Sequence, residues 1–346
     1  MMTAPRGMRP SGTAGRHYTI ASTRDRRPFV GRSQPAVQSG SPAITVLVVS
    51  DYGSWDDSGW DDLRQTLRAL GAEALEADAE VVLVDSLPGG RPSPPDLKDV
   101  IPGLRVVGPS PNGPQELLNE AVRSASSDLV ALLDGDCLPA PGWLRAATEV
   151  MRAHPEVAAA SGRTLYPDTS LLNRVLGLLS RGFIDPGRAG PTRFVTSYNA
   201  VFRRDSLLAH PLQTMQRALA ARMQTEAIRL DGGVLWFEPH MQATHRFEGW
   251  RMESRIRRNV GYRAVRVRQL DPRVPHAWVA RWGKLSIPLI VGARTLDSFR
   301  DCIRVGRFHG VRWFELPAAL AIAVGVHLLE IGGIAAALAD PPPEPR

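Results

Sequence analysis

The chain has 346 residues, of which 43% are hydrophobic and 22% are charged, and this ordinary globular balance excludes wholesale disorder, a collagen-like chain and a polytopic membrane protein. The net charge of +7 arises almost wholly in residues 1–40, which hold seven Arg and one acid, Asp25. Because the remainder is close to neutral, we expect no nucleic-acid partner. Cys137 and Cys302 form no C-x-x-C motif, so we expect no zinc site and reduced thiols.

The first segment, residues 1–42, is rich in Arg, Ser, Gly and Pro and shows no apolar periodicity. This composition predicts a disordered basic tail. An Arg- and Ser-rich start with few acids also fits a transit peptide, so both interpretations stay open for this segment.

Residues 43–270 alternate between apolar, β-branched runs and segments of helical spacing. The runs predicted as strands are 44–49, 81–84, 104–107, 129–133, 157–160, 194–202 and 234–237. The segments predicted as helices are 63–75, 115–124, 142–153, 171–179, 213–229 and the Arg-rich stretch 246–273. Strands that alternate with helices imply crossover connections. We therefore predict an α/β domain with a mostly parallel sheet that is flanked by helices on both faces.

The C-terminal part, residues 271–340, is predicted as a membrane-associated helical region, followed by a tail at 341–346. Its stretch 316–339 contains only two ionisable residues, His327 and Glu330. Such a length can cross a hydrocarbon core of about 30 Å, although a buried core helix or an interfacial helix would have the same composition. Three Arg precede the stretch, which predicts that the body lies at the cytoplasmic face of the membrane, peripheral or single-span.

The common nucleotide and hydrolase signatures are absent: the sequence has no G-x-G-x-x-G, no G-x-x-x-x-G-K-[ST], no G-x-S-x-G and no H-E-x-x-H. Its most informative motif is Asp134-Gly135-Asp136, directly after the predicted strand 129–133. Open α/β sheets bind ligands where their strands end. Two carboxylates in such a turn can hold a hard divalent cation, and that cation can hold a diphosphate. An ordinary Asp-Gly turn is the alternative.

Two other strand ends carry polar side chains. Ser50 and Tyr52 follow the first predicted strand, and Asp85 follows the second. A nucleobase can stack on the tyrosine and hydrogen-bond to the carboxylate. The Asn112-Gly113 pair supplies a flexible turn ahead of the predicted helix 115–124.

These motifs together resemble the family 2 glycosyltransferases, whose fold is the single α/β domain called GT-A, over about residues 43–268. The matching motifs, in chain order, are Ser50-Asp51-Tyr52, Asp85, Asn112 through Asn119, Asp134-Gly135-Asp136 with Pro139, Pro141 and Trp143, Asn199 through Arg204, and Gly232 through Pro239 with His245. The stretch 112–119 departs from the family at Leu118, where Arg is frequent.

The resemblance implies roles for these positions. The nucleotide-sugar would contact Ser50, Tyr52, Asp85, Asn112, Gly113, Asn119 and Asp134. Mg²⁺ or Mn²⁺ would bind Asp136 and His245, since neutral imidazole suits an ion of the Mn²⁺ type. His240 should point to the opposite face of the strand. Asn199 and Trp236 would lie on the acceptor side.

The catalytic base is the main departure from the family. An acidic pair usually precedes the glycine by about a dozen residues, where this sequence has Leu219 and Ala220. Glu226 is the acid on this predicted helix and is the candidate base. A surface glutamate and a lost activity are the alternatives.

The expected function is therefore inverting, divalent-metal-dependent sugar transfer from a UDP- or GDP-sugar to a glycan, cell-envelope polysaccharide or lipid-linked acceptor at the membrane. The Arg-rich stretch after His245 fits a solvated helix face, anionic lipid or a lipid-linked phosphate; aromatic residues are too sparse there for nucleic acid. A catalytically inactive scaffold protein of the same family and a nucleotidyltransferase are the alternatives.

Overall fold

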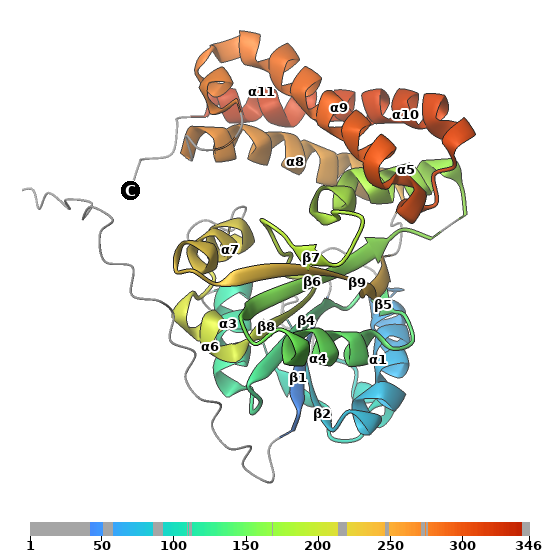
Figure 1. The fold of residues 1–346 in the computed structure, drawn as a ribbon, viewed down its shortest axis with the longest axis vertical. Coiled ribbons are helices and arrows are strands. Elements are labelled where there is room, and N and C mark those ends of the chain that lie inside the picture. The colour runs from blue at the N-terminus through green and yellow to red at the C-terminus, as the bar shows by residue number, and fades with distance from the viewer. Residues whose placement is uncertain are drawn as a thin grey trace, which may run out of the picture. The chain divides into compact units, whose positions relative to one another are not determined.

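The computed structural model describes residues 42–50, 58–85, 93–108, 110, 113–167, 169–213, 220–245, 249–270, 274 and 276–340 (Figure 1). All of them belong to one compact unit, Val37–Arg346. The predicted tail at 1–42 lies outside the described residues except for Pro42, and the tail at 341–346 lies wholly outside them.

A single mixed sheet organises the described residues. Its strands are β1 Ile44–Val49, β2 Ala79–Val84, β3 Arg105–Val107, β4 Leu129–Asp134, β5 Cys137–Pro139, β6 Val157–Leu165, β7 Gly190–Pro191, β8 Asn199–Arg203 and β9 Val234–His245. They lie in the order β3-β2-β1-β4-β8-β6-β9-β5, with β7 paired to β9. The strands β3, β2, β1 and β4 are parallel, whereas β8 is antiparallel to both of its neighbours.

Helices cover both faces of this sheet, and we call the sheet with these helices the sheet domain. The helices are α1 Ser58–Glu76, α2 Leu97–Val100, α3 Pro114–Ser124, α4 Trp143–Ala153, α6 Arg204–Ala209 and α7 Ala220–Leu230. Alternate residues of β1 enter two different cores: Val46 packs with α1, α2 and α4, and Leu47 packs with α3, α6 and α7. Burial on both faces explains why the strand sequence is a continuous apolar run. The predicted α/β class is confirmed.

The helical region contains α8 Trp250–Leu270, α9 Ser286–Val305, α10 Leu316–Leu329 and α11 Ile331–Ala339, with short 3₁₀ turns before and after α9. Its main core joins Val265 of α8 to Ile290 of α9 and Ile334 of α11. The Arg-rich helix therefore packs with the C-terminal helices (Figure 1), although the sequence boundary at 270 assigned it to the preceding domain. The helix α9 was not predicted from the sequence.

One helix joins the two parts of the molecule. The helix α5, Leu171–Arg181, contributes Val175 and Leu178 to a core shared with α9 and α10. Polar contacts reinforce the junction: Arg174 forms an ion pair of 2.6 Å with Glu315, and Arg257 of α8 donates a hydrogen bond of 2.6 Å to Ser180 Oγ.

The predicted apolar stretch 316–339 forms α10 and α11, which meet at Glu330. Within the described residues one helical stretch, Trp313–Ala339, is long and apolar enough to cross a membrane, with a mean hydropathy of 1.9. The acidic residue of the stretch 316–339, Glu330, has partners in the structure. Glu330 is fully buried and accepts hydrogen bonds from two groups of Arg294 on α9, and His327 Nδ1 lies 3.1 Å from its Oε1 atom.

Candidate functional site

The polar strand ends meet at one edge of the sheet. Because Val49 of β1 stands opposite Val84 of β2 and Asp134 of β4, the residues that follow these strands are neighbours. Ser50 and Asp85 are both buried, and Ser50 Oγ donates a hydrogen bond of 3.3 Å to Asp85 Oδ1. The structure thus brings together the two predicted nucleoside-binding residues that it describes here.

Close packing explains the glycine in the Asp134-Gly135-Asp136 motif. Its backbone N–H donates a hydrogen bond of 2.7 Å to the carbonyl of Val49, and a Cβ atom at this position would lie 3.0 Å from both that carbonyl and Leu63. A larger residue would therefore crowd the turn against β1. The tight turn sends the chain from β4 into β5 with Asp136 between the two strands.

Strand pairing brings His245 to this turn. Cys137 of β5 stands opposite His245, the last residue of β9. His245 Nε2 consequently lies 3.1 Å from Asp136 Oδ2. The predicted pair of metal ligands is adjacent in the structure, although 109 positions separate the two residues in the sequence.

The electrostatics of Asp136 suit a cation. Its side chain is only 8% exposed, and burial alone would raise its pKa. The charge and hydrogen bond of His245, helped by the charge of Arg181, instead hold the pKa of Asp136 below its ordinary value. Its Oδ1 atom is buried and has no hydrogen-bond partner among the described residues. An ionised carboxylate with one unused oxygen fits a Mn²⁺-type ion, and such an ion would take the place of the proton on His245, because the neutral imidazole is the form that binds metals.

A thiol completes the cluster but is a poor ligand for that ion. One ligand atom each from Asp136, Cys137 and His245 lies within 4.8 Å of the others. Burial, together with the charges of Asp136 and Asp134, raises the pKa of the fully buried Cys137 thiol well above its ordinary value. The thiol therefore stays protonated, and the thiolate is the form that binds metals.

Three residues that the sequence analysis missed surround the pair. Tyr166 stacks on the His245 ring, with 5.3 Å between centroids. Arg181, the last residue of α5, places its guanidinium carbon 3.7 Å from the centroid of the Tyr198 ring, and the Tyr198 carbonyl accepts a hydrogen bond of 3.1 Å from the Asp134 N–H. Burial opposes the charge of Arg181, but neighbours that include Tyr198 and Asp134 raise its pKa. The Arg181 guanidinium therefore stays positively charged beside the two carboxylates, and a guanidinium there can bind a diphosphate.

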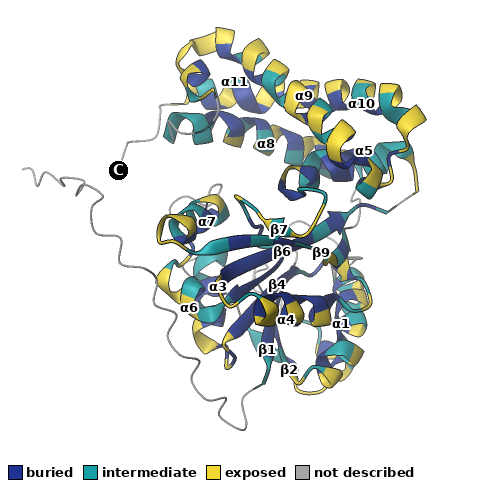
Figure 2. Cartoon of the chain, viewed as in Figure 1, coloured by how far each residue is buried: buried dark blue, intermediate teal, exposed yellow. Residues whose placement is uncertain are grey.

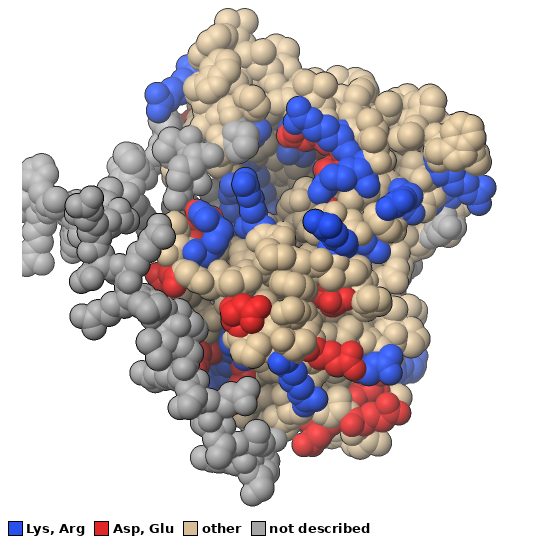
Figure 3. Space-filling view, viewed as in Figure 1, with Lys and Arg blue, Asp and Glu red and all other residues tan. Residues whose placement is uncertain are grey.

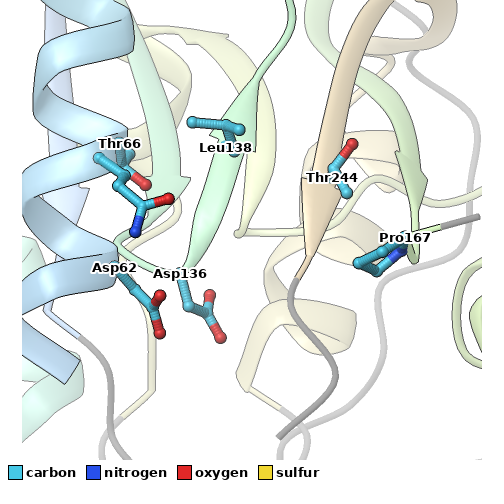
Figure 4. A pocket seen from close by; sticks show the side chains of 7 residues that line it. Asp62, Thr66, Asp136, Leu138, Pro167 and Thr244 are labelled. Atoms are coloured by element: carbon cyan, nitrogen blue, oxygen red, sulfur yellow. The ribbon is translucent and has the colours of Figure 1, made fainter. Parts of the chain in front are cut away.

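A small pocket opens beside Asp136 (Figure 4). It is lined by Asp62, Gln65, Thr66, Asp136, Leu138, Pro167 and Thr244. Asp62 of α1 places a further carboxylate on the same side as that of Asp136, as Figure 4 shows. The sequence analysis missed Asp62, because it lies just before the predicted helix 63–75 and outside any strand-end motif.

Two predicted ligand residues have structural roles. Asn119 exchanges two hydrogen bonds of 2.9 Å with the backbone of Leu212. Asn199 is fully buried; its Oδ1 accepts from Trp143 Nε1 at 2.8 Å, and its Nδ2 donates to groups on β6 and β9, the carbonyl of Met241 among them. In this conformation these amides are used within the protein, so they are not available to the nucleotide or to the acceptor.

The structure separates Trp236 from the metal pair. On the neighbouring strand β6, Trp236 stands opposite Ala160, and Thr244 stands opposite Leu165. The two positions are therefore five residues of β6 apart, and His245 is one residue further along. At about 3.3 Å per residue, Trp236 lies about 20 Å from His245. Its ring lies against that of His154, with 4.1 Å between centroids. The acceptor role of Trp236 stays a prediction.

Glu226 lies on α7, before the start of β9, and forms an ion pair of 2.7 Å with Arg229. Gly113 begins α3 with φ 94°, a value that favours glycine. The predicted contacts of Tyr52 and Asn112 lie outside the described residues.

Comparison with known families decides the class of protein. Residues 52–209 match the model of the family "Glycosyl transferase family 2". The chain contains a family 2 glycosyltransferase domain. A protein of this family transfers a sugar from a nucleotide-sugar donor, which is the activity expected from the strand-end motifs. The matched stretch of the glycosyltransferase includes Asp85, Asp134 and Asp136, whereas Ser50, Glu226 and His245 lie outside it.

Solved structures similar to this glycosyltransferase include three of low sequence identity. The mannosyltransferase PcManGT from Pyrobaculum calidifontis, in complex with GDP-Man and Mn²⁺, is 18% identical over 87% of this chain and 86% of its own, with a TM-score of 0.47. A mycobacterial protein is 16% identical over 64% and 73%, with a TM-score of 0.42. GalNAc-T7 with UDP, GalNAc and Mn²⁺ is 13% identical over 64% and 48%, with a TM-score of 0.45. No curated protein matches the sequence.

Proposed function

We propose that this glycosyltransferase moves a sugar, with inversion, from a UDP- or GDP-sugar to a glycan, cell-envelope polysaccharide or lipid-linked acceptor, and that it requires Mg²⁺ or Mn²⁺. The observation that carries the metal requirement is the unused, buried Oδ1 atom of Asp136, next to an imidazole that is 3.1 Å from its other oxygen. A buried polar atom without a partner is costly, and a bound cation would remove that cost.

The residues of the chain divide the work at the sheet edge. Asp85 would accept hydrogen bonds from the nucleobase, with Ser50 holding its carboxylate in place. Asp136 and His245 would hold the cation, which supplies charge stabilisation for the leaving diphosphate. Arg181 would add a second positive charge on the same side, in a chain where Leu118 replaces the arginine frequent in the family. Asp134 would contact the ribose or the cation.

The proposed base is Glu226, which would take the proton of the attacking acceptor hydroxyl. It forms an ion pair with Arg229 and would have to approach the donor from α7. The absence of an acidic pair at Leu219 and Ala220 supports a second candidate function, a catalytically inactive family member that binds a nucleotide-sugar. A nucleotidyltransferase remains the less favoured alternative, because the family match covers the Asp134 motif.

We also propose that the protein works at the cytoplasmic face of the membrane, held there by its C-terminal helical region. Nucleotide-sugars are made in the cytoplasm, and a lipid-linked acceptor would present its reacting group at the membrane surface. The apolar stretch Trp313–Ala339 supports this location.

The test of the metal site is donor binding and turnover with UDP- and GDP-sugars, with and without Mn²⁺. Asp136→Ala should abolish the Mn²⁺-dependent part of donor affinity in calorimetry, measured on protein that circular dichroism shows to be folded. Asp231→Ala, at an exposed acid, is the matched control and should behave as the wild type. Equal donor affinity of Asp136→Ala and the wild type with Mn²⁺ would refute the metal assignment.

The same assays separate the two candidate functions. If Glu226 is the base, Glu226→Gln should keep donor affinity and lose turnover by about 10²–10⁴-fold, the usual contribution of general base catalysis. Unchanged turnover in Glu226→Gln would place the base elsewhere. A wild type that binds donors without turning any of them over would support the inactive family member.

A further inference from the structure

The outer side of α9 carries a row of exposed apolar side chains among the charged residues Asp297, Arg300 and Arg304. Leu285, at the turn before the helix, and Leu289, Leu296 and Ile303 within it are all exposed, and Ile303 is 72% exposed. Their separations of four and seven residues place them on one stripe of the helix. The opposite side of α9 is buried against α8, α10 and α11 through residues such as Ile290. An outer apolar stripe has no role in packing within the chain.

The stripe is extended at both ends and beside it. Trp278 and Trp282 are exposed before α9, and Trp313, which is 82% exposed, follows it with Phe314. The neighbouring helix α10 has no Asp, Glu, Lys or Arg, and its outer residues are apolar. We call this surface, made of Trp278, Trp282, Leu285, Leu289, Leu296, Ile303, Trp313, Phe314, Val324, Leu328 and Leu329, the apolar face. The exposed positions on α9 and α10 appear yellow in Figure 2.

Basic side chains accompany the apolar face. The exposed residues Arg281 and Lys284 lie beside the two tryptophans, and Arg300, Arg307 and Arg312 lie toward the other end. In Figure 3 the upper surface, formed by the C-terminal helices, is mostly uncharged, and Lys and Arg gather in a band below it. Apolar side chains with flanking tryptophans and bases match the boundary between acyl chains and anionic head groups.

The packing of α10 and α11 argues against a transmembrane crossing. A Cβ atom on Gly261 of α8 would overlap the carbonyl of Glu330, and one on Gly333 of α11 would overlap the carbonyl of Arg258. The apolar stretch thus lies in close backbone contact with α8, which carries seven Arg. A crossing orientation would draw these charges toward the hydrocarbon or break the contact, and each buried charge costs several kcal/mol there.

We propose that the apolar face lies in the plane of an anionic membrane, inserted into one leaflet, and that residues 316–339 do not cross the bilayer. The inference deepens the proposed membrane location and does not depend on the transfer chemistry. The Glu330–Arg294–His327 cluster then lies inside the protein, on the side of the helices that faces away from the lipid.

Vesicle flotation of the full-length protein tests the face. The protein should float with vesicles of phosphatidylcholine and 30% phosphatidylglycerol, and at least tenfold less with pure phosphatidylcholine. The double variant Leu289→Glu, Leu296→Glu should lose at least tenfold of the binding. Leu75→Glu is the matched control, since Leu75 is 85% exposed on α1, away from the face. Flotation of the double variant at the wild-type level would overturn the proposal.

Two further measurements assign a loss of flotation to its cause. Mn²⁺-dependent donor binding should be the same in the double variant and the wild type, which shows that the sheet domain is intact and keeps this test separate from that of the proposed function. Light scattering without lipid should give the same mass for both. If the wild type is a dimer, the double variant is a monomer and neither of them floats, the apolar face is the contact with a second copy of the chain. That result would overturn the proposal.

Labelling from one side of the membrane distinguishes helices that lie in the membrane plane from a helix that crosses the bilayer. Leu75→Cys reports the side of the catalytic body and Pro343→Cys reports the end of the chain, while the native Cys137 and Cys302 are buried. In inverted membrane vesicles, a membrane-impermeant maleimide should label both introduced cysteines without detergent. Labelling of Leu75→Cys alone, with Pro343→Cys labelled only after detergent is added, would show a crossing helix and overturn the proposal.

Discussion

The sheet domain and the helical region differ in where their large apolar side chains gather. The two cores of the sheet domain are built from strand residues such as Val46 and Leu47, and its buried amides are hydrogen-bonded within the fold. Both parts bury charges, Asp136 in the first and the Arg257–Glu253 pair of 2.5 Å in the second, but the helical region exposes a row of leucine and tryptophan side chains. The first arrangement suits water on all sides. The second suits a region with an apolar phase on one side.

This contrast also separates the forces that hold each part. In the sheet domain, burial of apolar area supplies most of the stabilisation. In the helical region, small residues bring α8 and α11 together, and paired charges fix their register. A buried pair adds little net stability, but removal of one partner is strongly destabilising because the other charge stays buried. The helical region should therefore be the part more sensitive to single polar substitutions.

The largest expected effect is in the buried cluster of the helical region. Arg294→Met leaves the Glu330 carboxylate buried without its main partner, and should lower the free energy of unfolding by about 3–5 kcal/mol. Urea denaturation followed by tryptophan fluorescence measures the loss. Arg300→Met removes an exposed arginine of the same helix that pairs only with the exposed Asp297, and should cost less than about 1 kcal/mol. Equal costs for the two variants would contradict the contrast.

A smaller effect is expected from the amide inside the sheet domain. Asn199→Ala removes the acceptor of Trp143 Nε1 and the donor to β9, and should cost about 2–3 kcal/mol, since buried groups left unpaired cost about 1–3 kcal/mol each. Asn173→Ala, at an exposed hydrogen bond on α5, is the control. A wild-type melting temperature together with a raised acceptor KM would restore the predicted acceptor-side role.

The smallest effect lies where the two parts meet. Asp185 is buried between Arg163 of β6 and His309, which follows α9. Burial alone would raise its pKa, but His309, whose Nε2 lies 3.5 Å away, and the hydrogen-bonded Arg163 lower this pKa to about 2. A depressed pKa contributes stability that is present above the unfolded value of 3.8 and is lost as the pH falls toward 2.

Asp185→Asn should therefore cost about 2 kcal/mol at neutral pH, the equivalent of the difference between these pKa values, and should flatten the loss of stability between about pH 4 and pH 2. Thermal unfolding at a series of pH values measures both effects. Asp231→Asn, at an exposed acid, should retain the wild-type pH dependence. A steep acid transition that persists in Asp185→Asn would assign it to other carboxyl groups.

The sequence predicted those elements whose pattern of apolar residues follows directly from burial. The strand β1 was recognisable because both of its faces are buried, and Asp136 because it follows such a strand. The helix α9 was missed because apolar residues such as Ile290 and Leu296 lie on opposite sides, one buried and one exposed, which conceals the helical period. Tertiary packing alone assembles Tyr166, Arg181 and Tyr198.

Two predicted polar positions, Asn119 and Asn199, make contacts that the sequence did not indicate. Asn119 and Asn199 match motif positions, and a sequence gives no information on whether an amide faces a ligand or the backbone of its own chain. Their hydrogen bonds to Leu212 and to Met241 depend on segments some 40–90 residues away. The adjacent placement of Asp136 and His245 was predicted only through the family resemblance, because the pairing of β5 with β9 is not visible in the local sequence.

The helix α5 gives the molecule a mechanical link. Its side chains Val175 and Leu178 are held by α9 and α10, while its last residue, Arg181, contacts the Tyr198 ring beside the Asp134 turn. This helix, eleven residues long, connects the helical region to the Asp134 turn. A shift of α9 and α10 relative to the sheet domain would therefore also change the distance between the Arg181 guanidinium and the two carboxylates.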